Sequence, residues 1–86
     1  MANYQALAAY LRNLGTLTVQ MSFLDVEAIT GRLPKSARFL RQWWGNDRTH
    51  AQAREGWLAA GYETTAVSMK RQSLEFARSA RPGRVR

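Results

Sequence analysis

The stretch LPKSARFLRQWWGND, residues 33 to 47, decides how this chain folds, because three aromatic side chains share this short segment with basic and amide ones. Pro34 suits the first turn of a helix, where its missing N–H is not needed. On a helical wheel over residues 35–44, the apolar side chains fall on one continuous arc, made of Ala37, Phe39, Leu40, Trp43 and Trp44. We therefore predict a helix over residues 35–44 that buries this arc.

The opposite side of this predicted helix is polar and carries Lys35, Arg38, Arg41 and Gln42. A tryptophan used to stack on a nucleobase would be expected to interrupt that polar side, and neither tryptophan does. In so small a chain, large aromatic side chains most often form the core. Stacking of the tryptophans on a nucleobase stays open as the alternative. The basic residues on the polar side are the better candidates for binding a partner.

The chain has 86 residues, which is enough for one domain with one modest core. We predict a single domain over residues 1–78 and a basic, disordered tail over 79–86, where Pro, Gly and Arg predominate. Without cysteine and with His50 as the lone histidine, neither disulfides nor a zinc site is expected. No signal peptide and no membrane span are recognised, so we expect a soluble, cytoplasmic protein without a membrane partner.

The first third of the chain predicts a helix, a strand and a second helix. Apolar residues at helical spacing indicate a helix over 4–14, with Gly15 as its stop. Residues 17–23 alternate and predict a strand whose buried face holds Leu17, Val19, Met21 and Phe23. Ser22 with Asp25 fits a capping box for a short helix, which Gly31 ends and which turns Val26 and Ile29 inward.

The last third predicts one more helix and a hairpin. Thr49 with Gln52 fits a capping box for a helix that runs to Ala60 and stops at Gly61, with Ala53, Trp57 and Ala60 facing inward. We expect Trp44 and Trp57 to be buried, with one of them contacting the other or Phe76. Two strands follow around a basic loop over residues 70–73, and we predict the hairpin pairs Val67 with Phe76 and Met69 with Leu74.

This order of elements predicts the α+β class, as a small winged-helix-like domain. It runs helix, strand, two or three helices and β-hairpin, with a three-stranded antiparallel sheet in which the lone strand pairs with the hairpin. A generic small α+β domain, with the same order but without helix-turn-helix geometry, remains the alternative. The short connection TGRLPKS favours the winged-helix interpretation only weakly.

Four motifs resemble a small, uncharacterised prokaryotic domain family. Its pattern reads S-F-x-x-[IV]-E, L-P-x-S-A-R, W-W-x-N and A-x-x-x-W-L-x-A-G-[WY]. The matching positions are Ser22, Phe23, Val26, Glu27, Leu33 to Arg38, Trp43, Trp44, Asn46 and Ala53 through Tyr62. With the hairpin, the resemblance covers about residues 4–78 and leaves the Arg-rich tail outside. It implies membership of a family and no particular activity.

The formal net charge of +7 favours a polyanionic partner. Our leading hypothesis is a module that binds double-stranded DNA, acting as a regulator, an architectural factor, or an accessory protein of a mobile element or a host-defence system. The candidate nucleic-acid-binding residues are Lys35, Ser36, Arg38, Arg41, Gln42, Arg48, Lys70, Arg71, Arg78, Arg81, Arg84 and Arg86. The alternative is a protein-interaction module, an inhibitor or adaptor that binds an acidic partner surface. The oligomeric state is left open, a dimer included.

Some of these residues also have purely structural interpretations. Ser36 would cap the helix and Arg38 would pair with Glu27 or Asp47, instead of both contacting a phosphate. Asn46 would end one helix or cap the next, instead of reading an adenine edge. We predict no enzyme and no cofactor, because the acidic residues are scattered and no nucleophile triad or phosphate-binding loop is present.

Overall fold

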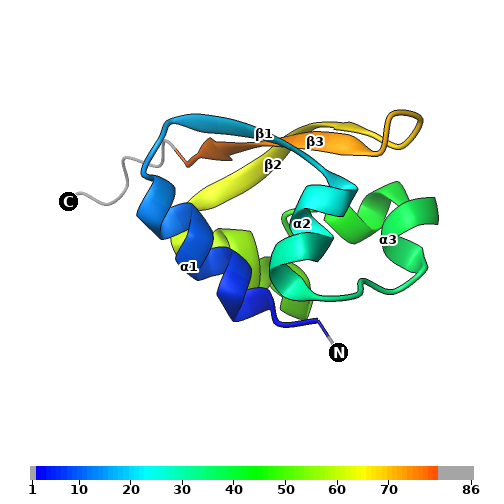
Figure 1. Cartoon of the computed structure of the whole chain (residues 1–86), viewed down its shortest axis with the longest axis horizontal. Coiled ribbons are helices and arrows are strands. Elements are labelled where there is room, and N and C mark those ends of the chain that lie inside the picture. The colour runs from blue at the N-terminus through cyan, green and yellow to red at the C-terminus, as the bar shows by residue number, and fades with distance from the viewer. Residues whose placement is uncertain (1, 80–86) are drawn as a thin grey trace.

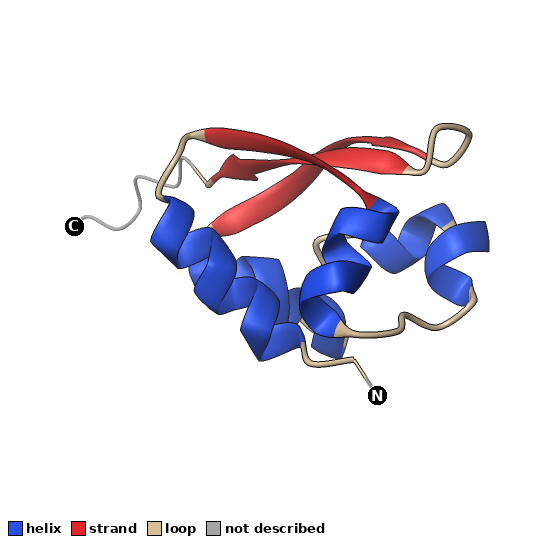
Figure 2. Ribbon diagram, viewed as in Figure 1, coloured by secondary structure: helices blue, strands red, loops and turns tan. Residues whose placement is uncertain are grey.

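The computed structural model describes residues 2–79, which form a three-stranded sheet with helices packed on one face (Figures 1 and 2). The α+β class and the antiparallel three-stranded sheet are therefore confirmed. In chain order the elements are α1 (Tyr4–Leu14), β1 (Thr18–Ser22), α2 (Phe23–Thr30), α3 (Ser36–Phe39), η1 (Arg41–Trp44), η2 (Gln52–Trp57), η3 (Leu58–Ala60), β2 (Tyr62–Ser68) and β3 (Ser73–Arg78).

The sheet has the strand order β1-β3-β2, so the last strand of the chain lies in the middle. β1 runs antiparallel to β3, from Thr18 opposite Ala77 to Ser22 opposite Ser73. The prediction that the lone strand pairs with the hairpin is therefore confirmed. As a result β1 and β2 are both edge strands, and each has one side without a strand neighbour.

The predicted ends of the first two helices are confirmed. Gly15 adopts the left-handed conformation, with φ 65°, and its N–H donates to the Leu11 carbonyl at 3.2 Å. Ser22 and Asp25 form both bonds of the capping box at the start of α2, at 2.9 Å each. The buried face of β1 is shorter than predicted, because the Leu17 side chain is 77% exposed ahead of the strand.

The predicted helix over residues 35–44 is wrong, because the backbone becomes extended at Leu40 (φ −118°, ψ 111°) and separates α3 from η1. In an unbroken helix, Ala37 and Trp44 would lie about 10.5 Å apart along the axis. The break brings them together, and the Trp44 indole N–H donates to the Ala37 carbonyl at 2.7 Å. Both tryptophans are buried as predicted, whereas Phe39 is 75% and Leu40 47% exposed, so these two leave the predicted core.

The segment between Thr49 and Gly61 also departs from the regular helix predicted there. The predicted capping box of Thr49 and Gln52 is wrong: the Asp47 carboxylate accepts from the Thr49 N–H and hydroxyl, and the buried Gln52 amide donates to the Trp43 carbonyl at 2.9 Å. The helical segment is irregular, and Gly56 within η2 has non-helical angles where it packs against α1. Gly61 ends η3 with φ 84°, as predicted.

The hairpin register differs from the predicted one. Thr64, not Val67, lies opposite Phe76, and Ser68 lies opposite Ser73. An irregularity between Thr65 and Ser68 shifts the pairing, and Ala66 there has a positive φ of 49°. The loop consequently spans residues 69–72, one position earlier than expected.

The core is centred on stacked aromatic rings. Trp44 lies between Phe23 and Trp57, with ring centroids 4.4 and 5.9 Å away, and Trp57 packs on Phe76 at 5.7 Å. All four side chains are at most 1% exposed. The prediction that Trp44 and Trp57 are buried and in contact is therefore confirmed.

The predicted tail begins with Ser79, and its remaining residues, 80–86, lie outside the described residues, with Arg81, Arg84 and Arg86 among them. Within the described part of the chain, no helix has the length and apolar character needed to cross a membrane.

Candidate nucleic-acid interface

The segment formed by α3 and η1 is fastened to the tip of the β2–β3 hairpin, at the opposite end of the sheet from the turn between α1 and β1 (Figure 1). The Arg38 guanidinium donates to the Gln72 side-chain oxygen, and the Gln72 amide donates back to the Arg38 carbonyl, both at 3.2 Å. The Arg41 guanidinium donates to the Val67 carbonyl at 2.7 Å. Two segments that are distant in sequence therefore form one continuous surface.

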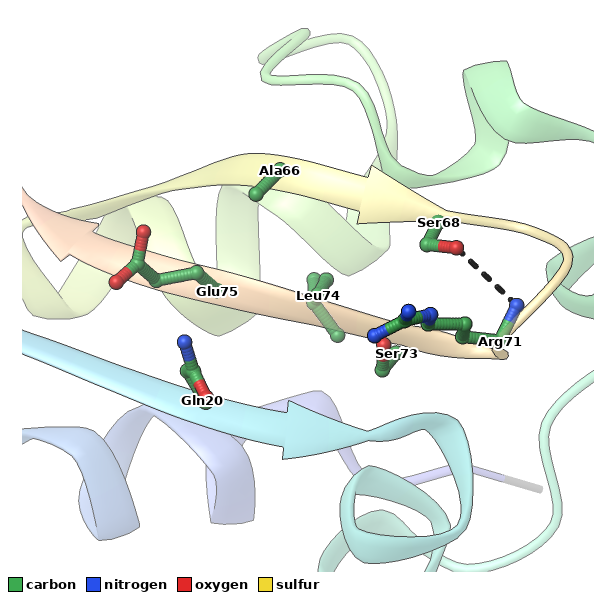
Figure 3. Close-up of a pocket in the computed structure, with 7 residues that line it drawn as sticks. All are labelled: Gln20, Ala66, Ser68, Arg71, Ser73, Leu74 and Glu75. Carbon is green, nitrogen blue, oxygen red and sulfur yellow. Dashed lines mark hydrogen bonds between the residues drawn. The ribbon is translucent and has the colours of Figure 1, made fainter.

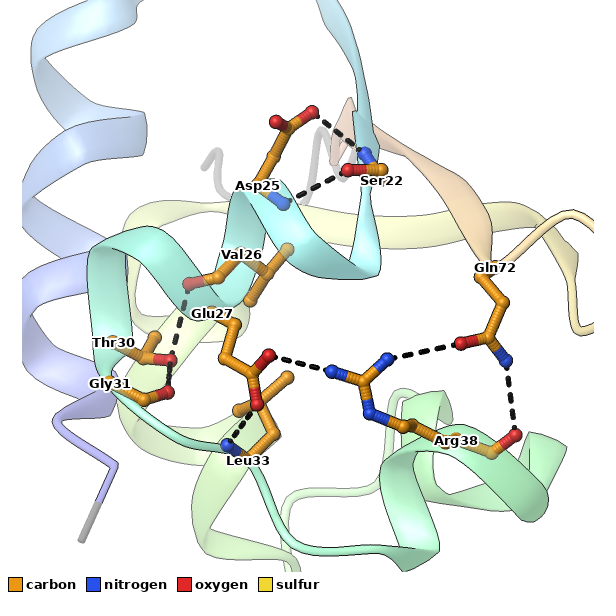
Figure 4. Close-up of polar contacts among 9 residues, drawn as sticks. All are labelled: Ser22, Asp25, Val26, Glu27, Thr30, Gly31, Leu33, Arg38 and Gln72. Carbon is orange, nitrogen blue, oxygen red and sulfur yellow. Dashed lines mark hydrogen bonds and ion pairs between the residues drawn. The ribbon is translucent and has the colours of Figure 1, made fainter.

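Arg38 is committed to the fold. It forms a 2.6 Å ion pair with Glu27, whose other oxygen accepts the Leu33 N–H at 2.8 Å (Figure 4). The Arg38 side chain is 33% exposed and bridges α2, α3 and the hairpin. The predicted pairing with Glu27 is confirmed, and a phosphate contact by Arg38 would compete with these bonds.

Ser36 does not cap α3. Lys35 occupies the N-cap position, and no side chain bonds to the first backbone N–H groups of the helix. The structural interpretation of Ser36 as the cap is therefore wrong. Ser36 is half-buried and its carbonyl accepts the Leu40 N–H at the end of α3.

The two joined segments carry four exposed cations. We call the following residues the tip surface: Lys35, Arg41, Lys70 and Arg71, together with Phe39. All five side chains are exposed, and among residues 2–79 the carboxylates form ion pairs with Arg38 and Arg54 only. The tip surface therefore combines unneutralised positive charge with one aromatic ring.

Arg71 extends the positive charge onto the open face of the sheet. Its side chain runs back from the turn along β3 and lines a hollow of about 370 Å³, with Glu75 further along the same strand (Figure 3). The Arg71 N–H donates to the Ser68 hydroxyl at 3.1 Å and holds the turn, while the guanidinium stays exposed. The hollow is open and polar, so it suits contact with a hydrophilic surface.

Other predicted binding residues lie apart from the tip surface. Arg78 ends β3 at the opposite end of that strand from the hairpin tip, and its guanidinium carbon lies 5.9 Å from the centre of the Tyr62 ring. Arg48 is exposed in the loop between η1 and η2, where its carbonyl accepts from Arg54. Gln42 lies beside Arg41 along a hollow of about 460 Å³ next to β2.

Two residues important here were not singled out from the sequence. Gln72 fastens the hairpin to α3, and its positive φ of 54° belongs to a turn that the predicted register misplaced. Phe39 was assigned to the core, because a regular helix would have turned it inward. The apolar periodicity of the sequence indicates neither the contact of Gln72 with α3 nor the exposure of Phe39.

Asp47 and His50, in the loop after η1, are a candidate pair for acid–base chemistry. The Asp47 carboxylate, however, holds the loop together by accepting hydrogen bonds from Thr49. The Thr49 N–H and hydroxyl donate to Asp47 and lower the pKa of that carboxyl below its ordinary value, with a smaller effect from His50. Among residues 2–79, no three His, Cys, Asp or Glu side chains cluster closely enough to hold a metal ion.

These features define a small α+β domain with an aromatic core and a basic end. The chain belongs to the family described as "Domain of unknown function (DUF7662)", which matches residues 4–80. The predicted membership of a small, uncharacterised domain family is thereby confirmed. No curated protein and no solved structure matches the chain.

Proposed function

We propose that this domain binds double-stranded DNA through the tip surface. The observation that carries the proposal is the joining of α3 and η1 to the hairpin tip by Arg38, Gln72 and Arg41. This joint holds together two segments that both carry exposed cations. Cations in a fixed array neutralise phosphates, release counterions and so supply most of the affinity of a DNA-binding surface.

Within this proposal the domain acts as a winged-helix-like module whose wing is the β2–β3 hairpin. The pairing of β1 with β3 and the position of α3 beside the hairpin tip support that interpretation. α3 has four residues and spans only about 6 Å, so it is too short to lie along a major groove. We therefore expect contacts from the start of α3, from η1 and from the hairpin tip together, with phosphates dominating over base edges.

The test compares two pairs of charge reversals. Lys70→Glu with Arg71→Glu alters the tip surface, and Arg32→Glu with Arg48→Glu makes the same change in net charge in two exposed loops outside it. Loss of two phosphate contacts reduces the magnitude of the negative slope of log affinity against log salt by about 1.8, which corresponds to an affinity about 60-fold weaker at 0.1 M salt. Fluorescence-anisotropy titration of duplex DNA at several salt concentrations measures both, and circular dichroism checks folding.

If both double variants lose the same DNA affinity, binding depends only on net charge, and the tip surface is rejected as the DNA-binding site. A parent protein that does not bind duplex DNA at low salt would reject the proposal itself. Arg38 is unsuitable for this test, since its reversal would break the Glu27 and Gln72 contacts and unfold the joint.

The exposure of Phe39 and Leu40 favours a second candidate function, the binding of an acidic protein surface. Aromatic and arginine side chains are enriched where protein interfaces concentrate their binding energy. Affinity purification after nuclease treatment, with the parent and with Phe39→Ser as bait, separates the two candidates. A stoichiometric protein that the parent retains and Phe39→Ser loses supports this second function, and its absence leaves DNA as the partner.

A further inference from the structure

β1 presents unpaired backbone groups along its outer side. The Arg78 N–H donates to the Leu17 carbonyl and the Phe23 N–H donates to the Gln72 carbonyl, so the odd-numbered residues of this segment face β3. In an antiparallel pair the alternate residues direct their N–H and C=O groups away from the partner. Thr18, Gln20 and Ser22 are those residues. The Ser22 N–H donates to the Asp25 carboxylate, and the Ser22 carbonyl, at the N-cap of α2, accepts the first bond of that helix, so Thr18 and Gln20 carry the unpaired groups.

The opposite edge of the sheet is blocked. The Asn46 side chain accepts the Thr64 N–H at 2.9 Å and donates to the Thr64 carbonyl at 3.2 Å, in the place of a neighbouring strand. Arg41 covers the Val67 carbonyl, and the irregularity at Ala66 interrupts the strand. Proteins protect edge strands from unwanted pairing with such charges, bulges and covering loops.

From Thr18 to Met21, β1 carries none of these protections, and only the Ser22 N–H at its end is covered, by Asp25. From Asn13 to Leu24 the sequence contains no charged residue and no proline, and β1 pairs with β3 in continuous register. The helices lie on one face of the sheet, and Thr18 and Gln20 are exposed. Leu17 and Leu24, on either side of the strand, are 77% and 66% exposed. An uncharged, regular edge flanked by exposed leucines is suited to pairing with another strand.

We propose that β1 pairs antiparallel with β1 of a second copy of this chain, which joins the two sheets into one. With a two-fold axis at Gln20, each Gln20 exchanges N–H and C=O bonds with its counterpart. Each Thr18 N–H lies opposite the Ser22 carbonyl of the other copy, an acceptor that it shares with the first turn of α2. The arrangement leaves the Ser22 N–H with Asp25, so the capping box of α2 is kept. It also brings Leu17 of one copy close to Leu24 of the other.

The observations select a second copy as the occupant of this edge. At the two-fold axis Gln20 meets its own counterpart, so a charged residue at this position would repel its copy. The uncharged stretch satisfies that requirement, and its exposed leucines lie at opposite ends, where antiparallel pairing makes them meet. The hairpin tip adjoins the Ser22 end of β1, so the pairing directs the two basic tip surfaces to opposite ends of the joined sheet.

The first test measures the mass of the full chain in solution without DNA, by sedimentation velocity and by light scattering across a concentration series. We expect a dimer of twice the 9.8 kDa chain mass. Gln20→Lys places two like charges at the axis and is expected to give a folded monomer. Thr65→Lys, which adds the same charge to an exposed position of β2, is the matched control and should remain a dimer.

The second test uses the absence of cysteine from the chain. Gln20→Cys introduces one thiol at the axis, where the two Cα atoms of an antiparallel pair are about 5.5 Å apart, within the range that a disulfide spans. We expect rapid oxidation to a covalent dimer for Gln20→Cys and slow, concentration-dependent crosslinking for Thr65→Cys. A parent that is monomeric at the highest soluble concentration, or a dimer that Gln20→Lys leaves intact, would overturn the proposal.

Discussion

Replacing Asn46 with alanine is expected to lower the free energy of unfolding by about 2–4 kcal/mol, although Asn46 is itself exposed. Its side-chain oxygen accepts from the Trp57 indole N–H at 3.0 Å and from the Thr64 N–H at 2.9 Å, and its amide donates to the Thr64 carbonyl at 3.2 Å. Trp57 is 1% exposed, so its indole N–H would lose its partner inside the core.

The magnitude follows from these contacts. A buried donor left without a partner costs about 1–3 kcal/mol, and a lost hydrogen bond at the more accessible strand edge costs about 0.5–1.5 kcal/mol. For a domain of this size the loss corresponds to a fall in Tm of about 10–25 °C. Urea unfolding followed by tryptophan fluorescence, together with thermal melting, measures the change.

Two control variants test the assignment of the cost. Asn46→Asp keeps the acceptor for the Trp57 and Thr64 N–H groups, but it replaces the donor with a carboxylate oxygen that faces the Thr64 carbonyl. It should therefore recover only part of the stability that Asn46→Ala loses. Asn13→Ala, at an exposed position of α1, should change stability by no more than about 0.5 kcal/mol. If Asn46→Ala stays within about 0.5 kcal/mol of the parent, Asn46 does not hold Trp57 and β2 in place, and the reasoning fails.

Three further changes have defined outcomes. Trp44→Ala removes the central ring of the aromatic core and should cost about 3–5 kcal/mol in denaturant unfolding; a cooperatively folding variant of parental stability would contradict the core assignment. NMR titration should place the pKa of Asp47 below its ordinary value, and Thr49→Val should raise it again. Because the folded-state pKa is the lower one, this contribution to stability is present above the unfolded pKa and is lost as the pH falls through the folded pKa. Ala66→Gly relieves a positive φ and should stabilise by up to about 1 kcal/mol in urea unfolding, whereas a clear loss of stability would show that the Ala66 methyl group packs usefully.

The features that depend on neighbours in sequence were predictable. The capping box of Ser22 and Asp25, and the stops at Gly15 and Gly61, are local arrangements whose chemistry is written in a few adjacent residues. The burial of Trp44 and Trp57 was predictable for another reason, because so small a domain has few other side chains that could fill its core.

The errors arose where a distant contact overrides a local pattern. A helical wheel assumes an unbroken helix, and the bond from Trp44 to the Ala37 carbonyl requires the chain to turn at Leu40. The hairpin register failed because Thr64, a polar residue, occupies a buried position that apolar alternation assigns elsewhere. Its hydroxyl bonds to the Trp44 carbonyl, which only the folded chain brings near.

The candidate site was predictable in composition and only partly in arrangement. Lys35, Arg41, Lys70 and Arg71 were singled out from charge and exposed turns, and bonds of Arg38, Arg41 and Gln72 join the two segments that carry them. Arg38 looked equivalent to them, but only the structure shows that it fastens the site instead of facing outward. Arg78 was grouped with them as well, because charge alone does not reveal that β3 carries it to the other end of the sheet.

The central place of β3 also sets the order in which the chain can fold during its synthesis. β1 appears early, but its partner is the last strand, so almost the whole domain must leave the ribosome before any part of the sheet can close. Until then α1 and α2 have no sheet to pack on, and the uncharged β1 segment remains open to the wrong partners. A chain terminated before Ser73 would therefore lose the whole sheet and not merely one strand, and we expect cells to degrade it.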